Sequence, residues 1–247
     1  MSSKKFKGKT CVYCCAPNAS ETADHVVARQ FALERQRDGL PKVPACRRCN
    51  GEKSALETYL TTVMPFGGMH DDASETLQSM VEKRLEKNPR LTRELSAGQT
   101  YRIERVVNGV LIPSMTIPFD HEPLRQLYEY IARGLAFVRW GLLLPPETCI
   151  VHAEFLSSAG QGLFQQLFGL AMQQRVSDDF GNGVFVYEAG MAKDPNELTV
   201  WRMSLYGARL ADHVAGESVS DAYVLTAPRR MKAVHDLVRL MSQPRAA

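Results

Sequence analysis

The 247-residue sequence lacks any hydrophobic run long enough to cross a membrane. Its richest apolar stretch, from Gly134 to Pro145, contains Arg139 and ends in two prolines, whereas a spanning helix needs about 20 apolar residues. The first residues are basic, but no apolar stretch follows them, which argues against a secretory signal. We therefore expect a cytoplasmic protein with no membrane partner.

Cysteine is almost absent after residue 50. Five of the six cysteines precede that point and one follows it. A secreted, disulfide-stabilised domain would have cysteines throughout, so this distribution indicates one local site. Paired thiols in the cytosol usually bind metal or carry out redox chemistry. The six are Cys11, Cys14, Cys15, Cys46, Cys49 and Cys149.

A strong net charge of one sign is also missing. The chain has 30 Lys and Arg against 27 Asp and Glu, a net charge of +3, which excludes a uniformly basic nucleic-acid binder. The charge is unevenly placed, because residues 1–60 carry 11 basic and 6 acidic side chains, leaving 19 and 21 for residues 61–247. A head of net charge +5 on a body of −2 indicates an anionic partner for the head.

The chain divides into four segments with an α+β pattern. Residues 1–9 are predicted to be a basic flexible tail, 10–62 a cysteine-containing module, 63–70 a linker punctuated by Pro and Gly, and 71–247 a larger α+β domain. Asn108-Gly109 predicts a hairpin turn within that domain. Apolar spacing predicts helices at 71–95, 121–144, 161–174 and 229–241, and strands at 100–107, 110–117, 149–155, 184–187 and 198–205.

Two Cys-x-x-Cys pairs are separated by 31 residues: Cys11 with Cys14, and Cys46 with Cys49. Two residues between thiols let a tight turn direct both sulfurs at one ion, and two such turns complete a tetrahedral zinc site. A redox dithiol would account for one pair only. We predict structural Zn²⁺ bound by these four thiolates, with Cys15 open as an alternative ligand to Cys14.

A second pattern lies between and after the pairs. Asp24-His25 stands in the long loop, and Asn50-Gly51-Glu52-Lys53 directly follows Cys49. In this order the motifs resemble the HNH, or ββα-metal, endonucleases in their zinc-bearing form. The resemblance covers about residues 10–60 and implies two strands followed by a helix around a nuclease site.

The resemblance also implies a role for each residue of the second pattern and its neighbours. His25 would be the general base that takes a proton from water. Asp24 and Asn50 would hold a catalytic divalent cation, Mg²⁺ or Mn²⁺, at the scissile phosphate. The expected activity is metal-dependent hydrolysis of nucleic acid, with double-stranded DNA as the first expected substrate. The nucleic-acid-binding residues would be Arg47, Arg48 and Lys53.

Two positions depart from the family pattern. Ala28 stands where proline is frequent, and Pro41 where an Asn or His would orient the base. These departures leave two alternatives open: a zinc-dependent module that binds nucleic acid without cleaving it, and a zinc-stabilised interaction protein with no nucleic-acid role. Residues 71–247 would select the target, bind a protein partner or form a homodimer.

Overall fold

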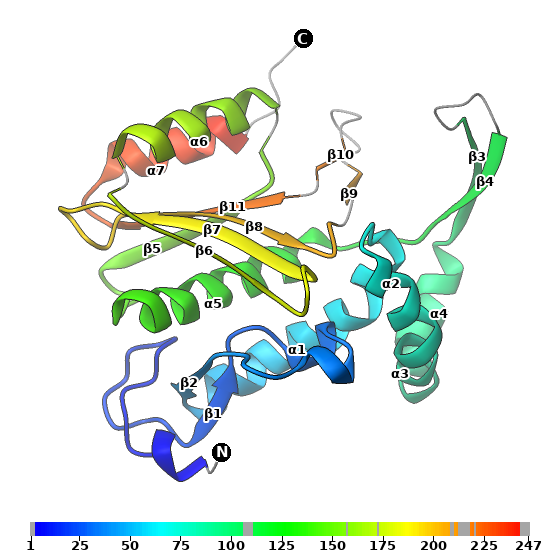
Figure 1. Ribbon diagram of the computed structural model, residues 1–247, viewed down its shortest axis with the longest axis horizontal. Coiled ribbons are helices and arrows are strands. Elements are labelled where there is room, and N and C mark those ends of the chain that lie inside the picture. The colour runs from blue at the N-terminus through cyan, green and yellow to red at the C-terminus, as the bar shows by residue number, and fades with distance from the viewer. Residues whose placement is uncertain are drawn as a thin grey trace.

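The computed structural model describes residues 3–105, 111–156, 158–171, 173–207, 210–211, 218–219 and 221–242. Its architecture is mixed α+β, with an N-terminal hairpin and helices followed by a five-stranded antiparallel sheet (Figure 1). The predicted α+β class is therefore confirmed. Among the helices described, none is long and apolar enough to cross a membrane.

The head is a short β-hairpin followed directly by a helix. Strand β1 (Thr22–His25) pairs antiparallel with β2 (Lys42–Ala45), and α1 (Arg47–Val63) begins two residues later. Cys46 caps α1, because its sulfur accepts a hydrogen bond from the Cys49 amide in the way a serine oxygen usually does. The head has the strand, strand, helix order that the resemblance implies.

The helix predicted over 71–95 is divided in two by a break at Asn88. Helix α2 (Asp71–Thr76) continues through a π-helical turn into α3 (Glu82–Lys87), and α4 (Pro89–Ala97) then begins anew. Pro89 causes the break, because proline has no amide hydrogen and restricts the residue before it. The side chain of Asn88 accepts the amide hydrogen of Leu91 and caps the new helix.

A separate two-stranded ribbon extends beyond α4 (Figure 1). Strands β3 (Thr100–Arg105) and β4 (Leu111–Thr116) pair antiparallel, as the sequence predicts. The predicted Asn108-Gly109 turn lies outside the described residues. Helix α5 (His121–Trp140) follows and ends at Gly141 in a left-handed conformation, with φ of 66°, before the two prolines.

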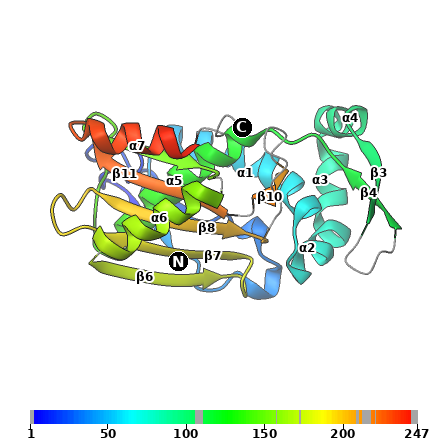
Figure 2. The ribbon, with the colours of Figure 1, turned by 90° about the horizontal axis from the view of Figure 1, so that it is seen from above.

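The body is a sheet covered by helices on both faces. Helix α5 lies on one face, between the sheet and the head, while α6 (Ser158–Ala171) and α7 (Lys232–Ser242) lie on the other (Figures 1 and 2). All neighbouring strands run antiparallel in the order β5-β11-β8-β7-β6. The sheet strands are β5 (Cys149–Glu154), β6 (Gln174–Phe180), β7 (Phe185–Met191), β8 (Thr199–Leu205) and β11 (Asp221–Pro228); β9 (Leu210–Ala211) and β10 (Ser218–Val219) form a small separate pair.

Head and body share one hydrophobic core. A single cluster of buried side chains runs from Val43 in the head through Leu135 of α5 to Trp201 in the sheet. The segment predicted as a linker, 63–70, is packed against the body: Met64 is buried, and the amides of residues 69 and 70 donate to the Tyr206 carbonyl. The head is therefore seated on the body through buried contacts.

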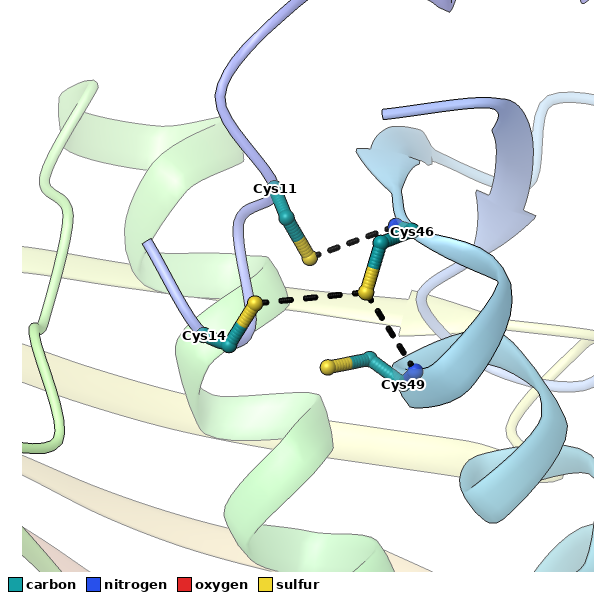
Figure 3. Close-up of side chains that lie close together, drawn as sticks. All are labelled: Cys11, Cys14, Cys46 and Cys49. Atoms are coloured by element: carbon teal, nitrogen blue, oxygen red, sulfur yellow. Dashed lines mark hydrogen bonds between the residues drawn. The ribbon is translucent and has the colours of Figure 1, made fainter. Parts of the chain in front are cut away.

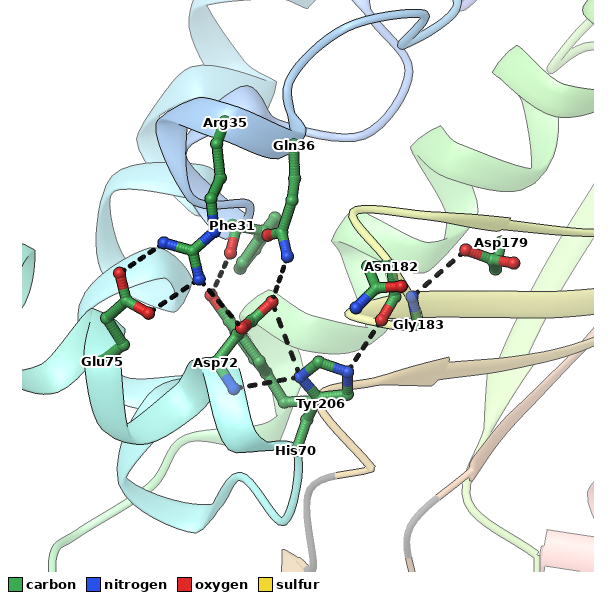
Figure 4. Close-up of polar contacts among 10 residues, drawn as sticks. All are labelled: Phe31, Arg35, Gln36, His70, Asp72, Glu75, Asp179, Asn182, Gly183 and Tyr206. Carbon is green, nitrogen blue, oxygen red and sulfur yellow. Dashed lines mark hydrogen bonds and ion pairs between the residues drawn. The ribbon is translucent and has the colours of Figure 1, made fainter.

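Polar contacts add to this attachment (Figure 4). Arg35 in the head makes two hydrogen bonds to Glu75 of α2, at 2.6 and 2.8 Å. The buried Tyr206 hydroxyl donates to the carbonyl oxygen of Phe31. Further contacts pair Gln36 with Asp72 at 2.7 Å and His70 with the carbonyl of Asn182 at 2.9 Å.

Candidate functional site

Four thiols meet at the start of α1 (Figure 3). Their sulfurs all lie within 4.8 Å of one another, and no other group of three or more His, Cys, Asp or Glu side chains in the described residues meets so closely. Thiolates about 2.3 Å from a tetrahedral zinc lie about 3.8 Å apart; the Cys14 and Cys46 sulfurs are 3.9 Å apart. The predicted cluster is thus confirmed and is compatible with structural zinc. Its members are Cys11, Cys14, Cys46 and Cys49.

Backbone amides donate hydrogen bonds to two sulfurs of this cluster, and such bonds stabilise negative charge on sulfur. The Cys46 amide donates to the Cys11 sulfur at 3.3 Å, and the Cys49 amide donates to the Cys46 sulfur at 3.5 Å. The helix N-terminus also favours thiolates. Burial raises the pKa of the Cys49 thiol, and a cation bound at the centre of the cluster would favour the ionised form.

Cys15 is outside the cluster. Its backbone adopts a left-handed conformation, with φ of 56°, and its sulfur faces the carbonyl of Val12 at 4.0 Å. The alternative left open by the sequence is therefore resolved in favour of Cys14, which shares the cluster with the other three thiols.

The carboxylate of Asp24 is buried and points toward α1. Its Oδ2 atom accepts a hydrogen bond from the Tyr13 hydroxyl at 2.5 Å and lies 3.1 Å from the Lys53 ammonium. Burial raises the pKa of Tyr13, so the hydroxyl remains a donor at neutral pH. Asn50 is separately engaged, since its Nδ2 donates to Thr22 Oγ1 at 3.2 Å.

Lys53 does not face phosphate as we expected. Its side chain is fully buried, and its ammonium contacts Asp24, the Glu57 carboxylate and the carbonyl oxygen of His25, the last at 2.7 Å. Lys53 and Glu57 are four residues apart on α1, so both lie on the helix surface that packs on β1. Lys53 is therefore part of the interior of the head. Contrary to the prediction, its ammonium is not exposed to a nucleic acid.

His25 lies on the other face of the hairpin from Asp24, because adjacent strand residues point to opposite faces. Lys42 is directly opposite His25 in the strand pairing, so these two side chains share a face. Burial, then the charges of Lys42 and Arg29, lower the pKa of His25 to about 4. The imidazole is therefore neutral at pH 7 and has a ring nitrogen without a proton, but the lowered pKa makes it a weaker base than an ordinary histidine.

Asp24, one of the two residues expected to hold Mg²⁺ or Mn²⁺, does not fit that ion as it stands. Its Oδ2 atom accepts from a hydroxyl and pairs with the Lys53 ammonium, which already supplies positive charge. Asn50 donates through Nδ2 to Thr22 Oγ1. A hard divalent cation requires oxygen ligands that are free to coordinate it, whereas Asp24 Oδ2 is already engaged by a hydroxyl and an ammonium.

Arg47 and Arg48 are on the surface at the first turn of α1, with 82% and 73% of their side chains exposed. Arg47 pairs with Glu21 at 2.7 Å, and Arg48 lies 4.0 Å from Glu52. Exposed pairs of this kind contribute little to stability, at most about 1 kcal/mol, so both guanidiniums are accessible to an anion.

A cavity of about 340 Å³ lies between the four-thiol cluster and α5. Arg48 lines it from the head, and Glu129, Tyr130 and Arg133 line it from α5. Burial raises the pKa of Glu129 to about 7, although the positive charge of Arg133 opposes the increase. The sequence did not indicate Glu129 as a candidate residue. A single acidic residue on an amphipathic helix is usually exposed, and Glu129 loses solvent only because the head packs against α5.

Comparison of the chain with protein-family models, with curated proteins and with solved structures found no match. The resemblance to the HNH endonucleases therefore depends on the order of the motifs and on the four-thiol cluster.

Proposed function

We propose that the head cleaves nucleic-acid phosphodiester bonds with His25 as the general base. The observation that carries this proposal is the placement of a neutral His25 at the end of β1, beside Lys42 and Arg29. A neutral imidazole can take a proton from the attacking water as its oxygen bonds to phosphorus and the P–O bond to the leaving oxygen breaks, and adjacent cations can neutralise the phosphate. The strand, strand, helix order and the four-thiol cluster support the same reading.

In this proposal the phosphate contacts differ from those implied by the resemblance. Lys42 and Arg29, and not the buried Lys53, supply positive charge beside the base. The exposed Arg47 and Arg48 contact phosphates farther along the nucleic-acid strand. The zinc stabilises the head and takes no part in the reaction. Because Asp24 is already paired with the Lys53 ammonium, no step of the reaction is assigned to Mg²⁺ or Mn²⁺.

The proposed substrate is nucleic acid, with double-stranded DNA as the first choice. The net charge of +5 over residues 1–60 favours a polyanion over a small neutral substrate. Residues 71–247 are proposed to select the target, bind a protein partner or form a homodimer.

The test compares the zinc-loaded protein with His25→Ala on plasmid, linear duplex, single-stranded DNA and RNA, each with Mg²⁺, Mn²⁺ or a magnesium chelator. Loss of a general base typically reduces the rate by about 10²–10⁴-fold. Arg93→Ala, on an exposed face of α4, is the control and should retain full activity. Equal cleavage by native protein and His25→Ala, or no cleavage of any substrate by the native protein, would refute the proposal.

A second candidate is a zinc-dependent module that binds nucleic acid without cleaving it. The observation that favours it is the pairing of Asp24 with Lys53, which removes the expected metal ligand. It predicts salt-dependent binding with no turnover, and a salt slope that falls by about one unit when Lys42 or Arg29 becomes Ala. The interaction-protein alternative predicts no binding to nucleic acid at all.

A further inference from the structure

The buried Lys53 ammonium is enclosed by oxygen atoms from two elements of the head. Strand β1 contributes Oδ2 of Asp24 at 3.1 Å and the carbonyl oxygen of His25 at 2.7 Å, while α1 contributes Oε1 of Glu57. Lys53 has no exposed side-chain surface, and Glu57 is largely buried. We call this group of Asp24, His25 carbonyl and Glu57 oxygens the oxygen cage.

The cage has the chemistry of a cation site. Two carboxylates and a backbone carbonyl are ligands that a hard divalent cation prefers in proteins. Two carboxylates and one ammonium leave one net negative charge, whereas a divalent cation in place of the ammonium would balance both. The cage therefore suits a divalent cation electrostatically, but the Lys53 side chain fills it.

We propose that Lys53 is the internal cation of the head, occupying a latent divalent-cation site and excluding free ions from it. In the native protein the ammonium neutralises Asp24 and Glu57 and fixes the His25 backbone through its carbonyl. Removal of the ammonium exposes the cage to Mg²⁺ or Ca²⁺. This inference concerns ion binding and stability, and it does not depend on the proposed cleavage activity.

The experiment measures thermal unfolding of the zinc-loaded, full-length protein in increasing Mg²⁺ or Ca²⁺. Native protein should show no ion-dependent change in Tm. Lys53→Ala should unfold at a lower temperature without added ion, because two buried carboxylates lose the ammonium that pairs with them. Its Tm should then rise saturably with Mg²⁺ or Ca²⁺, as expected when an ion binds the folded state alone.

Two further variants separate ion binding in the cage from a general effect. Asp24→Asn in the Lys53→Ala background should lose the ion-dependent rise. Lys53→Met, which keeps the bulk of the side chain but no charge, should be destabilised and should show no rise, because the cage stays filled. A Lys53→Ala protein whose folding does not respond to either ion, including one unfolded at every concentration, would overturn the proposal.

The native protein provides a second measurement that requires no variant of Lys53. Calorimetric titration of the zinc-loaded protein with Mn²⁺ should give the same result before and after Asp24→Asn, since no free ion enters the cage. One equivalent of Mn²⁺ bound by native protein and lost in Asp24→Asn would show that the ammonium does not exclude the ion, and would also overturn the proposal.

Discussion

Gly134 of α5 lies so close to Val26 that a Cβ atom on this glycine would stand 2.7 Å from Cγ1 and 2.9 Å from Cγ2 of the valine. Val26 directly follows His25, and it is fully buried. The absence of a side chain at position 134 thus lets α5 approach the end of β1. The body of the protein is in this way packed against the backbone that carries the proposed general base.

Gly134→Ala should therefore destabilise the protein, although alanine normally favours a helix. The added methyl group overlaps Val26, and overpacking of this kind typically costs about 1–3 kcal/mol. Urea unfolding monitored by circular dichroism measures the change. Gly162→Ala on α6 is the matched control, because no atom lies within 4 Å of its added Cβ, and it should be neutral or stabilising. Equal stability of the two variants would contradict the close approach.

The cysteine site could be predicted from the sequence because its geometry is local. The two residues between the thiols of each pair define a tight turn that the sequence shows directly. Only the approach of one pair to the other depends on the fold. Helix α5 was also predicted, since its apolar spacing is regular. The edge strand β6 was not, because it contains Ser177-Asp178-Asp179 and lacks apolar alternation. Strand β11 was also not predicted, although its apolar run from Ala222 to Leu225 has the length of a short buried strand.

Side-chain partners across the fold could not be predicted. The order of motifs brought Asp24 and Lys53 to attention, but their pairing depends on how α1 is rotated against β1. The same holds for His152 and His235, which are 83 residues apart in the sequence. Nε2 of His152 lies 3.0 Å from Nδ1 of His235, within hydrogen-bond distance. The positions of the two histidines in the sequence do not indicate this contact, because strand β5 and helix α7 come together only when the chain folds.

Zinc should be present at about one equivalent per chain, and the head should depend on it. Cys46→Ser or Cys49→Ser removes a ligand that is also part of the first turn of α1, and we expect loss of zinc and unfolding of the head. Metal analysis and hydrogen exchange of residues 10–62 measure these effects. Cys15→Ser is the control, because Cys15 is outside the cluster, and it should retain zinc. Zinc loss from Cys15→Ser alone would reverse the assignment of Cys14.

Glu129 should make the protein less stable as the pH rises. Its pKa is raised to about 7 in the folded state from an ordinary 4.5, so its favourable contribution is complete below pH 4.5 and is lost as the pH passes 7. Glu129→Gln stays neutral and should exceed native stability at pH 8 by about 3 kcal/mol at most, with no advantage at pH 4. The difference in unfolding free energy between the two proteins across this range is the measurement. Glu86→Gln, exposed on α3, should show no such pH-dependent gain in stability over the native protein.

His25 should titrate well below an ordinary histidine. Its pKa is lowered to about 4 from 6.5, first by burial and then by Lys42 and Arg29. Between pH 6.5 and 4 the unfolded chain binds a proton that the folded chain does not, so the free energy of unfolding should fall as the pH falls through this window. An NMR titration of the His25 ring protons should place its midpoint near 4.

The Lys42→Ala variant tests the electrostatic contribution to this shift, which is added to that of burial. Loss of the cation opposite His25 should raise its pKa toward 6.5, and any cleavage activity should lose its acid limb at a correspondingly higher pH, because the base must be neutral to act. Lys83→Ala, on the exposed surface of α3, should leave the titration unchanged. A native His25 that titrates near 6.5, or a midpoint unmoved by Lys42→Ala, would show that the two side chains do not share the face on which the proposed chemistry depends.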